Sequence, residues 1–120
     1  MVIYDIGCNV GNWLDANYNK KDTFIAVEAN PEAWLQSWEK FKLRPNVEIL
    51  NWLVADEDGH KRPFYVSHHS TGEVSSASMD WVKKSRHSFV ETWSDPILVE
   101  TKTLDSLIKE YGDADFIKID

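Results

Sequence analysis

The sequence predicts an α/β fold built on a doubly wound, mostly parallel sheet. Short apolar runs of the kind that form buried strands alternate regularly with segments whose apolar residues recur at helical spacing. The chain has 120 residues, enough for one hydrophobic core but not for two. We therefore expect a single domain that covers residues 1–120.

The first strand is expected at residues 2–6, and two glycines, Gly7 and Gly11, break the apolar run before a short helix that reaches about Tyr18. Glycine adopts backbone angles that are closed to other residues, and its lack of a Cβ lets a ligand approach the main chain closely. The pattern strand, glycine turn, helix thus predicts a ligand-binding turn, with an ordinary structural turn as the alternative.

The spacing of the glycines helps to select the ligand. A dinucleotide-binding turn would have glycines at positions 7, 9 and 12, whereas this chain has Asn9 and Asn12 at two of them and its second glycine at Gly11. The spacing therefore disfavours NAD.

The second strand, expected at residues 23–27, ends at an acid, Glu28. An acid at this place, about twenty residues beyond the glycine turn, can accept hydrogen bonds from the ribose hydroxyls of an adenosine-containing cofactor. NAD-binding proteins and methyltransferases both have one there. The alternative is a solvated acid at a strand end.

A helix is predicted to begin at Asn30, which caps it, with Pro31 at the first helical position. Four large apolar residues then fall at helical spacing, and we expect them to face the core: Trp34, Leu35, Trp38 and Phe41.

A third strand is expected at residues 47–50, followed by Asn51 and Trp52. Ligands of doubly wound sheets lie beyond the carboxyl ends of the strands. Asn51 and Trp52 are therefore candidates for the adenine side of a pocket, with simple packing as the alternative.

Residues 62–67 indicate an edge strand or hairpin arm, because Pro63 suits an edge. The serine-rich residues 67–78 are expected to form a surface loop close to the pocket. The adjacent His68 and His69 do not have the spacing of zinc ligands, so we expect no metal site.

A strand-like run at 96–102 precedes a helix that Thr103 caps and Gly112 ends. The last apolar run, residues 115–120, is expected to form a fourth core strand, and it ends in an acid, Asp120.

The formal net charge of −7 argues against non-specific binding to nucleic acid or to anionic membranes, since both require a basic face. Small neutral or cationic partners fit better. Cys8 is the single cysteine, so no intramolecular disulfide can form, and the amino terminus has no signal-like segment. We expect a cytoplasmic protein.

In their order and spacing, six motifs make the chain resemble the FkbM family of S-adenosylmethionine-dependent methyltransferases, which implies a Rossmann-like sheet of the class I methyltransferase type. The motifs lie at residues 4–11, 27–31, 56–59, 75–78, 103–107 and 115–120.

The resemblance implies S-adenosylmethionine as cofactor and, as the reaction, O-methylation of a small molecule or sugar. It places Asp120 at the methyl-transfer site as a candidate base. It places Asp5, Gly7, Asn9 and Gly11 around the methionine part of the cofactor and Glu28 at the ribose. The full set of expected cofactor-binding residues also contains Cys8 and Ala29, together with Asn51 and Trp52, whose position after the third strand makes them candidates for the adenine side. The alternatives are a cofactor-binding or partner-binding module without turnover and, less favoured, an NAD-dependent oxidoreductase.

The terminal run also carries an expectation about completeness. A parallel strand is normally covered on both faces and paired on both sides, yet the sequence stops at Asp120. We expect a fold truncated after its fourth core strand, a domain incomplete at its carboxyl end, or a second copy or partner that covers this strand.

Overall fold

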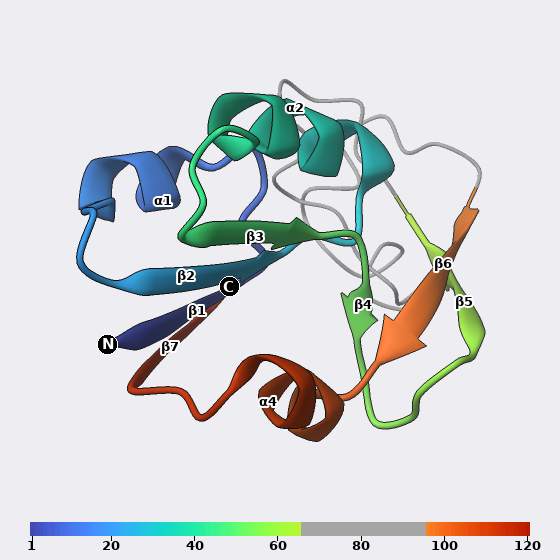
Figure 1. Cartoon of the computed structure of the whole chain (residues 1–120). Helices are drawn as coiled ribbons and strands as arrows, with labels where there is room; N and C mark the ends of the chain where they lie inside the picture. The colour runs from blue at the N-terminus through green and yellow to red at the C-terminus, as the bar shows by residue number, and fades with distance from the viewer. Residues whose placement is uncertain (66–95) are drawn as a thin grey trace.

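The computed structural model describes residues 1–65 and 96–120, and these form two sheets and three helices (Figure 1). The expectations for the serine-rich loop, for His68 and His69 and for the motif at residues 75–78 lie outside the described residues.

The larger sheet has four strands in the order β3-β2-β1-β7, and every neighbouring pair is parallel. Its strands are β1 (Val2–Ile6), β2 (Thr23–Val27), β3 (Val47–Leu50) and β7 (Phe116–Ile119). The helices are α1 (Asn12–Asn17), α2 (Pro31–Phe41) and α4 (Leu104–Tyr111). The predicted strand and helix positions in this part of the chain are confirmed.

Helices cover both faces of the larger sheet: α1 and α2 lie on one face and α4 lies on the other (Figure 1). Because side chains alternate along a strand, each face has its own core. Ile3 packs in one cluster with Leu14 and Phe41, and Tyr4 packs in another with Leu107. The predicted doubly wound α/β fold is therefore confirmed.

The smaller sheet has three strands in the order β4-β6-β5. They are β4 (Leu53–Val54), β5 (Lys61–Phe64) and β6 (Ile97–Lys102), with β6 parallel to β4 and antiparallel to β5. Pro63 lies in β5, at an edge, as predicted. Phe64 and Val99 pack against Ala29, so this sheet joins the main sheet just beyond the end of β2.

The predicted core-facing stripe of α2 is partly wrong. Leu35 and Trp38 are 48% and 37% exposed, whereas the residues that α2 buries are Ala33, Ser37 and Phe41. These three lie four positions apart and form one face of the helix. The buried face is thus narrower and carries smaller side chains than hydrophobicity alone predicted.

Close packing against the glycine turn explains the small side chain at Ser37. A Cβ added to Gly11 would lie 3.0 Å from Phe41 Cε2 and 3.4 Å from Ser37 Cβ, so α2 is pressed against the turn. Trp34 is half-buried, and its indole N–H donates to the Ile49 carbonyl at 3.0 Å.

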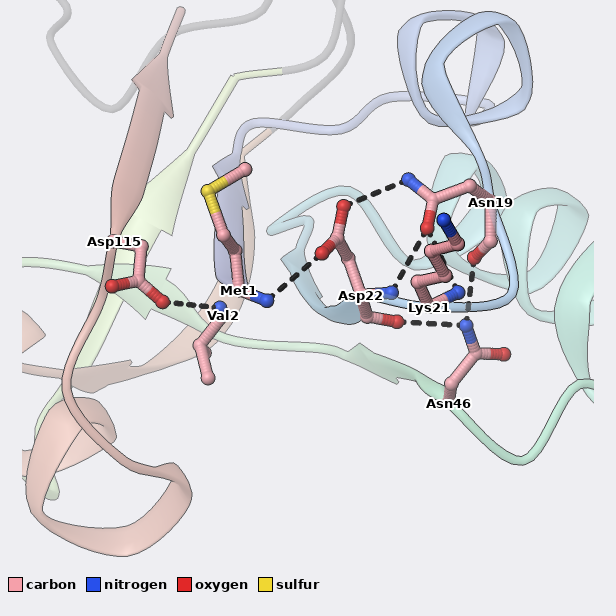
Figure 2. A network of polar contacts seen from close by, with 7 residues as sticks. All are labelled: Met1, Val2, Asn19, Lys21, Asp22, Asn46 and Asp115. Carbon is pink, nitrogen blue, oxygen red and sulfur yellow. Dashed lines mark hydrogen bonds and ion pairs between the residues drawn. The ribbon is translucent and has the colours of Figure 1, made fainter.

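A polar network closes the amino-terminal end of the larger sheet (Figure 2). Asp22 accepts hydrogen bonds from the Met1 ammonium and from Asn19 Nδ2, both at 2.8 Å. Asn46 Nδ2 donates to the carbonyls of Asn19 and Asp22, at 2.9 and 2.8 Å. The network joins the start of β1 to the loops that precede β2 and β3.

Among the described residues β7 is an edge strand, paired with β1, and its Phe116 and Ile119 are 50% and 66% exposed.

Within residues 1–65 and 96–120 the structure contains no helix that is both long enough and apolar enough to cross a membrane.

Candidate functional site

A pocket of about 570 Å³ lies at the carboxyl end of the larger sheet. This is where doubly wound sheets bind ligands, and the volume lies within the range of small-molecule sites. The lining comes from both sheets, from α1 and from the start of α4. It consists of Ile6, Gly7, Cys8, Asn9, Asn12, Trp13, Val27, Glu28, Ala29, Trp52, Leu53, Val54, Phe64, Leu104, Lys118, Ile119 and Asp120.

The turn after β1 has three residues with left-handed backbone angles: Gly7 at φ +84°, Asn9 at φ +52° and Gly11 at φ +87°. Asparagine tolerates this region better than most residues, so Asn9 can replace a glycine there. The N–H groups of Gly7 and Cys8 donate to the Val27 carbonyl at 2.8 and 3.0 Å. The turn is therefore tied to the end of β2 and holds its main chain at the pocket.

The two glycines of the turn have different surroundings. A Cβ on Gly7 would make ordinary contact with Asp120 Cβ, at 3.4 Å, and Gly7 lines the pocket. Gly11 lies outside the lining and contacts α2, as described above. The packing of α2 therefore explains Gly11 without any ligand.

Glu28 holds two turns of the pocket together. Its Oε1 accepts the Asn9 N–H at 2.8 Å and its Oε2 accepts the Asn30 N–H at 2.9 Å. Burial raises the pKa of the Glu28 carboxyl, and the backbone N–H groups oppose part of that rise. The sequence predicted a ribose contact for Glu28, which stays a prediction, whereas the structure shows this anchoring contact with the main chain.

Asp5 lies beneath the pocket and outside its lining, with a side chain that is 1% exposed. Neither of its carboxylate oxygens accepts a hydrogen bond from a described residue. Burial raises its pKa to about 6, although the nearby Lys118 ammonium, 3.5 Å from Asp5 Oδ1, lowers it in part.

Asp120 reaches the pocket from the end of β7, and its backbone N–H donates to the Ile6 carbonyl at 3.1 Å. Its Oδ2 accepts a hydrogen bond from Lys118 Nζ at 2.6 Å. Burial would lower the pKa of Lys118, but the contacts with Asp120 and Asp5 raise it overall. Lys118 is therefore a charged ammonium between two acids.

The remaining predicted residues divide into two groups. Cys8, Ala29 and Trp52 line the pocket, whereas Asn51 does not. Burial raises the pKa of the Cys8 thiol to about 12, which favours the protonated thiol at neutral pH. Asn51 Nδ2 donates to the carbonyls of Glu28 and Ala29, at 2.8 and 3.1 Å, and so supports the turn after β2.

Sequence reasoning missed several lining residues, among them Lys118, Trp13 and Phe64. Lys118 had one available signal, since it is a lone charge inside an apolar strand. No comparable signal marks Trp13 or Phe64. In the described ranges no three histidine, cysteine or acidic side chains come together as a possible metal site.

The sequence profile of the family described as "Methyltransferase FkbM domain" matches residues 5–120. Among solved structures, the chain is similar to a SAM-dependent methyltransferase from Aquifex aeolicus, with 25% identity and a TM-score of 0.38. That match covers 52% of this chain and 35% of the Aquifex chain, so it spans about a third of that protein. No curated protein matches. Since the family profile covers nearly the whole sequence, the chain belongs to the FkbM methyltransferase domain family.

Proposed function

We propose that the pocket binds S-adenosylmethionine and that the chain serves a methyl transfer to the hydroxyl of a small molecule or sugar. The position of Glu28 carries the proposal, because this buried carboxylate lines the pocket beside the glycine turn. A carboxylate has about four acceptor positions, and backbone N–H groups occupy one on each oxygen. In this proposal, the remaining positions accept hydrogen bonds from the two hydroxyls of a ribose.

The other lining residues fit the remaining parts of such a ligand. Trp52, Leu53 and Val54 offer an apolar wall for an adenine ring. The main chain at Gly7 and Asn9 lies at the middle of the pocket, where β1 ends between β2 and β7. The cofactor would supply a methyl group on a positively charged sulfur, and the acidic pocket favours a cation.

The chemistry left to the protein is positioning and the removal of one proton. Aligning an acceptor oxygen with the methyl group is largely a matter of holding both partners in place. Asp120 is an exposed carboxylate at the pocket, and it is the proposed acceptor of the hydroxyl proton. For the acceptor we propose only a chemical class, a small molecule or sugar that carries a hydroxyl group.

Calorimetric titration with S-adenosylmethionine, S-adenosylhomocysteine and NAD in parallel tests this function. Glu28→Gln should weaken binding of S-adenosylhomocysteine about tenfold to a hundredfold, because hydrogen bonds to a charged group contribute about 1.5–3 kcal/mol. Glu48→Gln, which changes an exposed acid on β3, is the matched control and should bind normally.

Thermal unfolding of both variants shows whether the fold is intact, which matters because Glu28 also anchors two turns. An unchanged dissociation constant in a folded Glu28→Gln variant would remove Glu28 from the site. Binding of NAD in place of S-adenosylhomocysteine would contradict the proposed function itself.

A further inference from the structure

Lys118 is the one cation among the described residues that line the pocket, where Glu28 and Asp120 are the acids. Strand register explains its position, since β7 pairs with β1 so that Lys118 lies directly opposite Asp5. Cross-strand partners project from the same face of a sheet. Lys118 therefore connects a buried acid below the pocket with the pocket itself.

The Lys118 ammonium is fixed in place but retains free hydrogen-bonding capacity. It has three N–H donors, and Asp120 Oδ2 at 2.6 Å accepts one of them. Asp5 Oδ1, at 3.5 Å, makes an ion pair without a hydrogen bond. The ring of Trp13 lies 5.5 Å from the ammonium and adds a cation–π contact. Donors thus remain for a ligand in the pocket.

The position of Lys118 relative to Glu28 suggests which part of a ligand it meets. β1 lies between β2, which leads to Glu28, and β7, which carries Lys118. Two strand spacings separate these strands by about 10 Å. A ligand whose ribose contacts Glu28 and whose chain crosses the turn at Gly7 would present its far end to Lys118.

We propose that Lys118 binds the carboxylate of the amino-acid head of the cofactor, and that Asp5 and Asp120 position the Lys118 ammonium for this contact. The proposal rests on the proposed function and deepens it. A lone carboxylate would be repelled by the two acids, whereas the ammonium of an amino acid offsets that repulsion. The geometry therefore favours a zwitterionic head over a simple acid.

Binding of S-adenosylhomocysteine is compared with binding of 5′-methylthioadenosine, which keeps the adenosine and the thioether but lacks the amino-acid head. Lys118→Met should weaken the first ligand about tenfold to a hundredfold and leave the second unchanged. Lys118→Arg, which keeps a cation, should recover most of the loss. Lys20→Met, an exposed lysine in the loop before β2, is the control and should change neither affinity.

Because Lys118→Met leaves Asp5 buried without its counter-charge, the double variant Asp5→Asn/Lys118→Met is measured as well. The same loss, confined to the ligand with an amino-acid head, is expected. Equal losses for both ligands, no loss, or tighter binding of S-adenosylhomocysteine would overturn the proposal. If the unsubstituted protein binds neither ligand, the proposed function fails and this inference fails with it.

Discussion

The two ends of the larger sheet differ in the direction in which they shift the pKa values of their acids. At the amino-terminal end, Asp22 accepts two hydrogen bonds, and these bonds, first of all the one from the Met1 ammonium, lower the pKa of its carboxyl (Figure 2). Asp115 closes the same end by accepting the Val2 N–H at 2.7 Å. At the carboxyl-terminal end, burial raises the pKa values of Asp5 and Glu28.

The backbone differs only in degree. Three residues with positive φ, Gly7, Asn9 and Gly11, lie at the carboxyl-terminal end of the sheet, whereas Gly112, at φ +109°, precedes β7 at the amino-terminal end. An aspartate therefore stabilises the fold at one end, whereas the buried charge of Asp5 is held at an energetic cost at the other. Such a cost is typical of a binding site, where function is retained at the expense of stability.

The largest effect is expected for Gly11→Ala. An added methyl would meet Phe41 at 3.0 Å in a backbone conformation that disfavours side chains, so unfolding should become easier by about 2–4 kcal/mol. Gly59 also has a positive φ, +70°, but no atom lies within 4 Å of an added Cβ. Gly59→Ala therefore measures only the cost of placing a side chain on a left-handed backbone, which is about 1 kcal/mol.

Urea unfolding of both glycine variants measures this difference. Gly7→Ala should resemble Gly59→Ala in stability, because its Cβ makes only an ordinary contact at 3.4 Å with Asp120, but it should weaken ligand binding. Equal destabilisation by Gly11→Ala and Gly59→Ala would show that the contact between the turn and α2 is not tight.

The next largest effect compares two Asp→Asn substitutions, at Asp5 and Asp22, which should change the free energy of unfolding in opposite directions. The folded-state pKa of Asp5 is raised from 3.8 to about 6, so its ionisation costs stability as the pH rises through that window. Asp5→Asn should therefore stabilise the protein at pH 7 by about 2 kcal/mol, and the gain should vanish below the ordinary pKa of an aspartate.

Asp22→Asn should instead destabilise the protein at pH 7. The folded-state pKa of Asp22 is lowered, so its contribution is present above the unfolded pKa and is lost as the pH falls through the folded value. Unfolding free energies at a series of pH values give both signs. A destabilising Asp5→Asn at neutral pH would contradict the unfavourable burial of the Asp5 charge.

The smallest effect compares the two asparagines that flank β3. Asn46 ties the loops of the amino-terminal network, and Asn46→Ala should cost about 1–2 kcal/mol of stability. Asn51 is exposed and supports the turn around Glu28, so Asn51→Ala should change stability less and weaken cofactor binding more. Denaturant midpoints measure the stability of the two variants, and calorimetric titration measures their affinity for the cofactor. If both variants lost the same stability and the same affinity, the contrast between the two ends of the sheet would be wrong.

The sequence by itself determined the elements whose signals are local. Asn30 with Pro31 marks the start of α2, and Thr103 with Gly112 marks both ends of α4, because a cap is a contact between residues a few positions apart. The parallel direction of the main strands followed from the alternation of strands and helices. The sequence singled out Glu28 for a similar reason, as an acid directly after a strand, and Glu28 lines the pocket.

Tertiary structure alone decided which residues far apart in the sequence come into contact. The opposition of Lys118 and Asp5 depends on the register between β7 and β1, which are more than 100 positions apart in the sequence. The assignment of β6 to a separate sheet, the exposure of Trp38 and the burial of Asp5 likewise depend on what packs against each segment. Local pattern cannot encode such contacts, because the partner of each residue is set by how the whole chain packs.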